Sequence, residues 1–176
     1  MAKELKIQAE ITPAAFREYS YFDAFRRQKR YKTPLLFLLI MAGFAGVCFA
    51  MTGRREHAML LGCVLLGVGL GLPAAYFLSF FLSVRSGVRL LAQKRVPASY
   101  AVTLSSAGIT IPAGGKTLQY SWDSIHYVYR IRRSTCVYVE AGRAYMLPLQ
   151  DPETEARLWD LICGMLPPDK CFDWRK

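Results

Sequence analysis

Two long uncharged segments, separated by the polar link 54–57, constrain this chain more than any other feature of its sequence. The first segment, residues 33–53, has 21 residues and the second, residues 58–84, has 27. As helices they would be roughly 31 Å and roughly 40 Å long, so the first matches the hydrocarbon core of a bilayer and the second exceeds it. We predict a transmembrane hairpin over residues 33–84, with spans at about 34–52 and 58–82. The alternative is a buried helical hairpin inside a soluble domain.

The charge distribution orients the predicted hairpin. The chain has 23 basic and 13 acidic residues, a net charge of +10. Residues 1–33 carry eight basic and four acidic groups, and residues 85–96 carry four basic and no acidic ones, so +8 of this charge flanks one end of the hairpin. Basic residues beside spans favour the cytoplasmic side, which predicts that both termini are cytoplasmic. The nearly neutral segment 97–176 argues against a nucleic-acid surface.

The same basic residues are candidate contacts for lipid headgroups, because each cation near an anionic leaflet gains about 1 kcal/mol of attraction. A topology signal without a specific lipid is the simpler interpretation. After the second span the cations alternate with apolar residues, so we expect 85–96 to be a basic juxtamembrane connector that lies as a short interfacial helix. The candidate contacts are Arg26, Arg27, Lys29, Arg30, Lys32, Arg85, Arg89, Lys94 and Arg95.

Small residues recur every four positions in both predicted spans, a spacing that lets helices approach closely in lipid. We predict that this helix-packing seam closes the hairpin on itself. Contact with another copy of the chain is the alternative, which leaves a homo-oligomer open. Pro73 interrupts the second span and predicts a kink, since it cannot bond the carbonyl of Gly69. The seam consists of Ala42, Gly46, Ala50, Gly67, Gly71, Ala75, Ser79 and Ser83.

Shorter patterned segments lie on both sides of the hairpin. Residues 5–11 alternate apolar and polar side chains, and Thr12 with Pro13 signals a helix start, so 1–32 is predicted as an N-terminal strand and an amphipathic juxtamembrane helix. From residue 97 onward, short strand patterns separated by turns predict an antiparallel sheet. Asp151 then begins an amphipathic helix. We expect an α+β membrane protein whose cytoplasmic β domain, 97–176, is closed by a C-terminal helix, the plan of a pleckstrin-homology-like fold.

Three short motifs resemble those of the YcxB-like family of bacterial membrane proteins. They are the segment 100–109 with its turn glycine Gly108, the segment 122–125 that leads into a strand, and the pair Leu147-Pro148. The family usually has a basic residue after that proline, where this chain has Leu149. The resemblance covers nearly the whole chain and implies two spans and a YcxB-like domain in the bacterial cytoplasmic (inner) membrane. It implies little about chemistry.

The sequence contains no pattern typical of a catalytic, cofactor-binding or metal-binding site. Gly115-Lys116-Thr117 ends like a phosphate-binding loop, but Thr110 stands where that loop needs glycine. The two histidines, His57 and His126, are far apart, and the five cysteines lack metal-ligand spacing. We therefore predict a non-enzymatic, membrane-anchored interaction or regulatory module without a cofactor. Its expected partners are the lipid bilayer and an undefined protein, and not nucleic acid. The alternatives are a lipid-headgroup-sensing module and an accessory subunit of a membrane enzyme or transporter.

Overall fold

The computed structural model describes residues 5–53, 57–93, 98–113, 116–140, 143–148 and 151–175, and the chain divides into two compact units. The β unit combines Met1–Tyr19 with Val88–Lys176, and the helical unit is Ser20–Gly87. The predicted division at residue 97 therefore differs from the structure. The difference arises because the N-terminal strand belongs to the same unit as the C-terminal strands, although the hairpin separates them in sequence.

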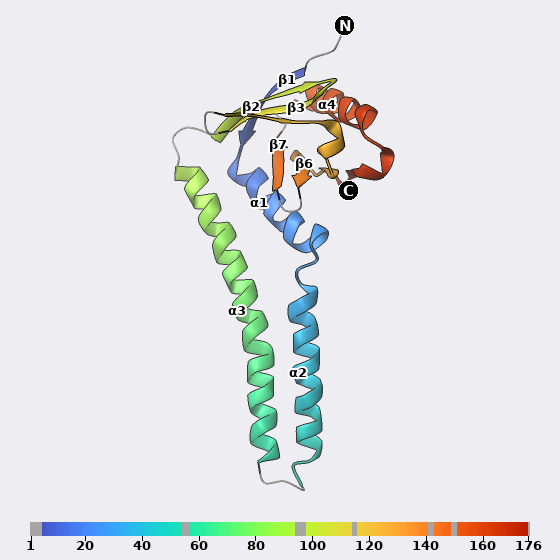
Figure 1. The fold of residues 1–176 in the computed structure, drawn as a ribbon. Helices are drawn as coiled ribbons and strands as arrows, with labels where there is room; N and C mark the ends of the chain where they lie inside the picture. The colour runs from blue at the N-terminus through green and yellow to red at the C-terminus, as the bar shows by residue number, and fades with distance from the viewer. Residues whose placement is uncertain are drawn as a thin grey trace. The chain divides into compact units, whose positions relative to one another are not determined.

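The β unit contains an antiparallel sheet in the order β1-β2-β3-β4 (Figure 1). Strand β1 pairs with β2 along its whole length, with Ile7 opposite Val102. Ile7 and Ala9 are buried and the intervening Gln8 is exposed, which confirms the half-buried strand predicted from alternation. The bounds of the strands are Leu5–Ile11 for β1, Ala98–Ser105 for β2, Gly108–Ala113 for β3 and Lys116–Tyr120 for β4.

The turn between β2 and β3 requires glycine. Gly108 has a φ of 146°, in a region that favours glycine over residues with a Cβ atom. A Cβ added to Gly108 would lie 2.0 Å from the carbonyl oxygen of Tyr120 on β4. The close approach of two backbones therefore fixes the residue type at this position.

A second, mixed sheet has the order β7-β6-β5-β8. Strands β5, β6 and β7 are antiparallel neighbours, whereas β8 pairs with β5 in parallel. Strand β1 also contacts β7, so the N-terminal strand connects the two sheets. The sequence does not predict β8, because three residues are too few for an alternation pattern to be visible. The bounds are Tyr127–Arg130 for β5, Ser134–Glu140 for β6, Arg143–Pro148 for β7 and Cys171–Asp173 for β8.

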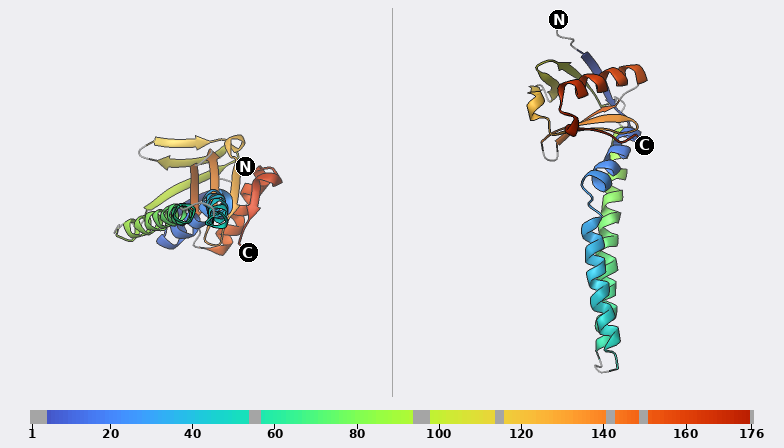
Figure 2. Two further views of the ribbon diagram at one scale, coloured as in Figure 1. Left: turned by 90° about the horizontal axis from the view of Figure 1, so that it is seen from below. Right: turned by 90° about the vertical axis from the view of Figure 1, so that its right-hand side faces the viewer.

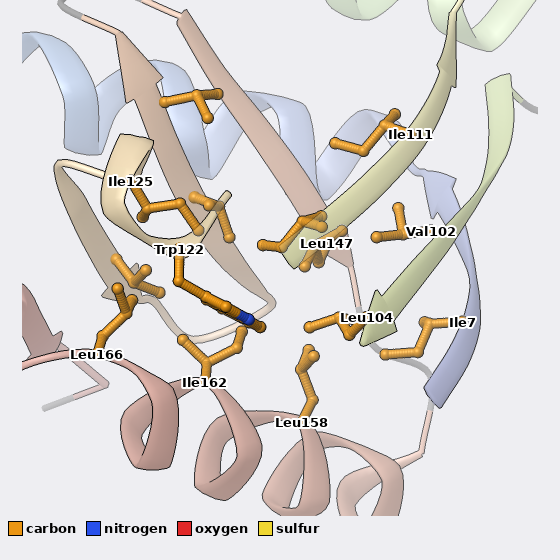
Figure 3. Close-up of a cluster of buried hydrophobic side chains, with 14 of the residues drawn as sticks. Ile7, Val102, Leu104, Ile111, Trp122, Ile125, Leu147, Leu158, Ile162 and Leu166 are labelled. Carbon is orange, nitrogen blue, oxygen red and sulfur yellow. The ribbon is translucent and has the colours of Figure 1, made fainter. Parts of the chain in front are cut away.

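Helix α4 (Pro152–Met165) completes the hydrophobic core of the β unit (Figure 3). The Asp151 carboxylate accepts hydrogen bonds from two backbone N–H groups of the first turn, which confirms the predicted helix start. Leu158 and Ile162 on α4 are fully buried beside side chains of the first sheet such as Leu104. Trp122 lies in a 3₁₀ turn (Trp122–Ser124), and its indole N–H donates to the Ser105 carbonyl at 3.0 Å.

Four helical segments connect β1 to β2. Helix α1 (Pro13–Tyr21) begins where predicted, with the Thr12 hydroxyl accepting from the Ala15 N–H at 3.2 Å. It continues into a π-helix, η1 (Phe22–Arg27). Helices α2 (Lys32–Ala50) and α3 (Ala58–Gln93) follow and run side by side (Figures 1 and 2). Both are long and apolar enough to cross a membrane. The separate connector helix predicted for 85–96 is not observed, because α3 is continuous to Gln93; residues 94–97 lie outside the described residues.

Candidate functional site

The two long helices meet through a few close contacts. A Cβ added to Gly62 would lie 2.8 Å from the Phe49 ring, and one added to Gly69 would lie 2.7 Å from the Met41 Cβ. Ala45 on α2 is also buried. Glycines at these two positions of α3 therefore make room for larger side chains of α2, which is how small residues stabilise helix pairs in lipid.

The predicted seam is a different set of residues, and all eight of its members are exposed. Nothing lies within 4 Å of a Cβ added to Gly46, Gly67 or Gly71. The prediction that the seam closes the hairpin on itself is therefore wrong. The four-residue spacing is present, but the glycines that α2 covers lie seven residues apart on another face of α3. Contact of the seam with a second copy stays a prediction. The exposed members are Ala42, Gly46, Ala50, Gly67, Gly71, Ala75, Ser79 and Ser83.

A pocket of about 520 Å³ lies in the helical unit, between the start of α2 and the middle of α3. This volume is within the range of small-molecule sites. The pocket has a polar end and an apolar wall. The polar end consists of Gln28, Lys29, Arg30 and Thr33, and the wall consists of Pro34, Phe37, Leu72, Pro73 and Tyr76.

A chain of hydrogen bonds orders the polar end of the pocket. Asp23 accepts from the Arg27 Nε at 2.6 Å and from the Gln28 Nε2 at 2.5 Å. The Gln28 side-chain oxygen in turn accepts from the Arg30 Nε at 2.6 Å. Lys29, with a φ of 49°, turns the chain between η1 and α2. The charge of Asp23 is thus balanced by Arg27, and the cations at the pocket itself are Lys29 and Arg30.

Aromatic packing supports the helical unit beside the pocket. The Phe25 ring stacks on Phe77 at 6.3 Å between centroids and meets Phe80 edge-on at 5.4 Å. Tyr21 meets Phe80 at 5.9 Å. These contacts pack η1 against the second half of α3. The packing positions the turn at Lys29 close to the wall of the pocket. Packing on α3 therefore accounts for the aromatic side chains of Tyr21 and Phe25.

The structure separates the predicted lipid contacts into groups. Lys29 and Arg30 line the pocket, whereas Arg27 pairs with Asp23. The remaining described candidates, which are Arg26, Lys32, Arg85 and Arg89, are exposed. Lys94 and Arg95 lie outside the described residues. Of the described candidates, Lys29 and Arg30 are the ones that line a pocket.

A second polar cluster lies in the β unit around Arg130, which is 6% exposed. The Arg130 Nε donates to the Glu155 carboxylate at 2.6 Å, its guanidinium lies 3.8 Å from the Asp173 carboxylate, and it covers the Trp159 ring at 5.3 Å. Arg130 therefore connects β5, α4 and β8. This geometry is typical of a buried structural ion pair and excludes Arg130 as an exposed contact for lipid phosphates.

Two ionisable groups beside this cluster have shifted pKa values. A hydrogen bond from Arg175, with the charges of Arg175 and Arg130, holds the pKa of Asp173 below its usual value. Burial and the adjacent Cys171 thiol raise the pKa of Cys163 to about 12. Both shifts widen the pH range over which Asp173 is charged and Cys163 is neutral at the contact between α4 and β8.

Sequence analysis missed the pocket, although it identified some of its members. It singled out Pro73 as an interruption of the span and the basic residues as topology signals. The signal that relates them is their position: Pro34 follows the basic run by two residues, and Pro73 lies about 22 Å of helix beyond the link on the returning helix. Both prolines line the pocket.

Comparison of the chain with protein-family models, with curated proteins and with solved structures finds no match in any of the three. Among the described residues, no group of three or more His, Cys, Asp and Glu side chains is arranged to hold a metal ion. The pocket in the helical unit is the candidate site. Two cations beside an apolar wall complement an amphiphile with a negatively charged end.

Proposed function

We propose that this chain is a membrane-anchored interaction or regulatory module, in which α2 and α3 cross a bilayer and the β unit binds a partner. The observation that carries the proposal is the exposure of apolar side chains on the two helices. Only 6% and 17% of their most apolar windows are buried within the chain. Leu39 is 62% exposed and Leu60 is 67% exposed. Helices of a soluble core bury such residues, which argues against the soluble-hairpin alternative.

The strand pairing supports the proposed topology. Because β1 precedes the hairpin and β2 follows it, their pairing requires both ends of the hairpin to lie on the same side of the membrane. The basic residues cluster at these ends, so we assign that side to the cytoplasm. Kinship with the YcxB-like family is part of the proposal, and with it a bacterial cytoplasmic membrane.

The β unit, we infer, is a pleckstrin-homology-like module with the hairpin inserted after its first strand. Support comes from the order of its elements: four antiparallel strands, three more, then a helix that completes the core. Strand β8 is an addition to that plan. Because Arg130, Glu155 and Asp173 pair with one another, we assign them a structural role, and we assign binding of the partner to the exposed surface of this unit.

Three measurements test the proposal. The full chain, expressed in bacteria, should stay in the membrane fraction during alkaline carbonate extraction, and its release would overturn the membrane assignment. Two variants with a single cysteine test the orientation. The cysteine of His57→Cys should react with an impermeant maleimide in intact cells, whereas Cys171 in the other variant should react only after permeabilisation. The opposite labelling pattern would reverse the orientation. A photo-crosslinker at the exposed Tyr127 then tests binding, and an adduct of discrete mass is expected.

A further inference from the structure

We propose that the pocket between α2 and α3 binds one molecule of an anionic phospholipid, with the lipid phosphate at Lys29 and Arg30 and an acyl chain along Phe37 and Leu72. This inference rests on the proposed membrane location. It goes beyond that function because it assigns a ligand class and its contacts to a site in the helical unit.

The polar end of the pocket is positive. Among its lining residues are two cations and no acidic side chain. The nearest carboxylate in the hydrogen-bond chain, that of Asp23, is already paired with Arg27. Within the described part of the chain, no carboxylate lies within ion-pair distance of Lys29 or Arg30. The Arg30 Nε donates a hydrogen bond to the Gln28 side-chain oxygen, which orients the guanidinium. This bond does not use the two terminal nitrogens, which can donate to a phosphate oxygen.

The apolar wall continues directly from the cations. Phe37 lies one helical turn beyond Thr33 on α2, and Leu72 on α3 is 57% exposed within the chain. An inorganic anion would leave this wall uncovered. A peptide would bring backbone groups that the wall cannot satisfy with hydrogen bonds. An acyl chain covers apolar surface without that cost, so the two chemistries of the pocket together specify a lipid.

The depth of the pocket agrees with this occupant. Counted from the link, Tyr76 is 18 residues along α3 from Ala58, which is about 27 Å of helix. Thr33 is separated from Ala50 by about 26 Å on α2. Both distances approach the roughly 30 Å of a hydrocarbon core, so the polar end falls at the headgroup level. The phenol of Tyr76, 42% exposed, is a side chain favoured at that level.

The test measures lipid binding to the full chain in detergent by native mass spectrometry, with added phosphatidylglycerol or phosphatidylcholine. We expect one phosphatidylglycerol to bind in preference to phosphatidylcholine. The double variant Lys29→Gln/Arg30→Gln should weaken that binding by about tenfold or more, because two headgroup cations are lost. The variant Arg85→Gln/Arg89→Gln removes the same charge from exposed positions outside the pocket and should change binding by less than about threefold. Equal losses in both double variants would show diffuse attraction and overturn the site.

The apolar wall has its own control. Leu72→Trp places a larger ring in the pocket and should weaken phosphatidylglycerol binding, whereas Leu70→Trp, at a similarly exposed position outside the pocket, should not. Competition by millimolar glycerol phosphate would show that the wall contributes nothing and would overturn the acyl-chain assignment. Carbonate extraction of the same variants separates the two proposals. A chain that stays in the membrane without preferring phosphatidylglycerol refutes only the lipid site, whereas a wild-type chain released by carbonate refutes both.

Discussion

The β unit and the helical unit contain similar apolar side chains and place them in opposite ways. In the β unit, Leu104 and Leu158 are fully buried, and they face residues from segments far apart in sequence. In the helical unit, Leu39 and Leu60 are more than 60% exposed. In the β unit, folding itself removes the apolar surface from water. In the helical unit, the apolar surface stays exposed and can leave water only through contact with an apolar medium. The difference is what the proposed membrane location requires, with the β unit folding in water and the outward faces of the two helices meeting lipid.

The backbone follows the same division. Helices α2 and α3 satisfy their hydrogen bonds within each helix, so they need no partner strand in an apolar medium. The sheets of the β unit satisfy theirs between segments, and β1 finds its partner only after the entire hairpin has been traversed. Mutations that affect packing should therefore act strongly in the β unit and weakly on the outward faces of the hairpin.

The sharpest test of this contrast exchanges leucine for alanine in both units. Leu158→Ala should lower the free energy of unfolding of the β unit by about 3 to 4 kcal/mol, because it leaves a cavity in a closed core. Leu60→Ala should change that free energy by less than about 0.5 kcal/mol. Denaturant titration in detergent can follow both variants by tryptophan fluorescence, since all three tryptophans lie in the β unit. Similar losses in the two variants would contradict the contrast.

The buried ion pair gives the next largest effect. Arg130→Ala should destabilise the β unit by about 3 kcal/mol, because the partly buried Glu155 loses its partner at 2.6 Å and keeps only the more exposed Arg175 at 3.5 Å. Strand β8 should become accessible at the same time, which limited proteolysis of the C-terminus can detect. The control is Arg132→Ala at an exposed position, for which little change is expected. An Arg130→Ala variant as stable as that control would show that the cluster is dispensable.

Glycine positions distinguish the inner and outer faces of the hairpin. Gly69→Ala should destabilise the helix pair by about 1 to 2 kcal/mol, because the new methyl group would overlap the Met41 side chain. Gly71→Ala, with open space at the Cβ position, should be neutral or slightly stabilising, since alanine favours helix. Thermal unfolding of the full chain in detergent, followed by far-ultraviolet circular dichroism, compares the two variants. Equal melting temperatures would contradict the close contact at Gly69.

The smallest expected effect depends on pH. Tyr100 donates a hydrogen bond to the Met146 carbonyl, and burial, with the nearby Cys136 and Tyr145, raises the pKa of its phenol. Because the folded-state pKa lies above the unfolded value of about 10, the stabilisation is complete below that pH and is lost as the pH rises beyond it. Tyr100→Phe should cost about 1 kcal/mol at pH 7. The difference between the two proteins should shrink above pH 10 in denaturant titrations, and a constant difference would exclude Tyr100 as its source.

Much of the fold follows from local signals. The strand at 5–11, the starts of α1 and α4, the two long apolar helices and most strands of the β unit are predictable, because alternation, caps and hydrophobic length act within a few residues. The pairing of β1 with β2 is not, since register between distant segments depends on the assembled core. Strand β8 escaped notice because it is short, and the helix-packing seam was misassigned because spacing alone does not say which face meets a partner. The sequence drew attention to the cations and to Pro73, but it did not predict that Lys29, Arg30 and Pro73 line one pocket.

The pairing of β1 with β2 also has a consequence for biosynthesis. The ribosome synthesises β1 before the hairpin and β2 after it, so β1 has no pairing partner in β2 while both long helices are made. Its partner becomes available only once the second helix has left the exit tunnel. For a protein inserted in the membrane as proposed, completion of the first sheet therefore coincides with completion of insertion, and a chain that fails to return across the bilayer leaves its edge strand open.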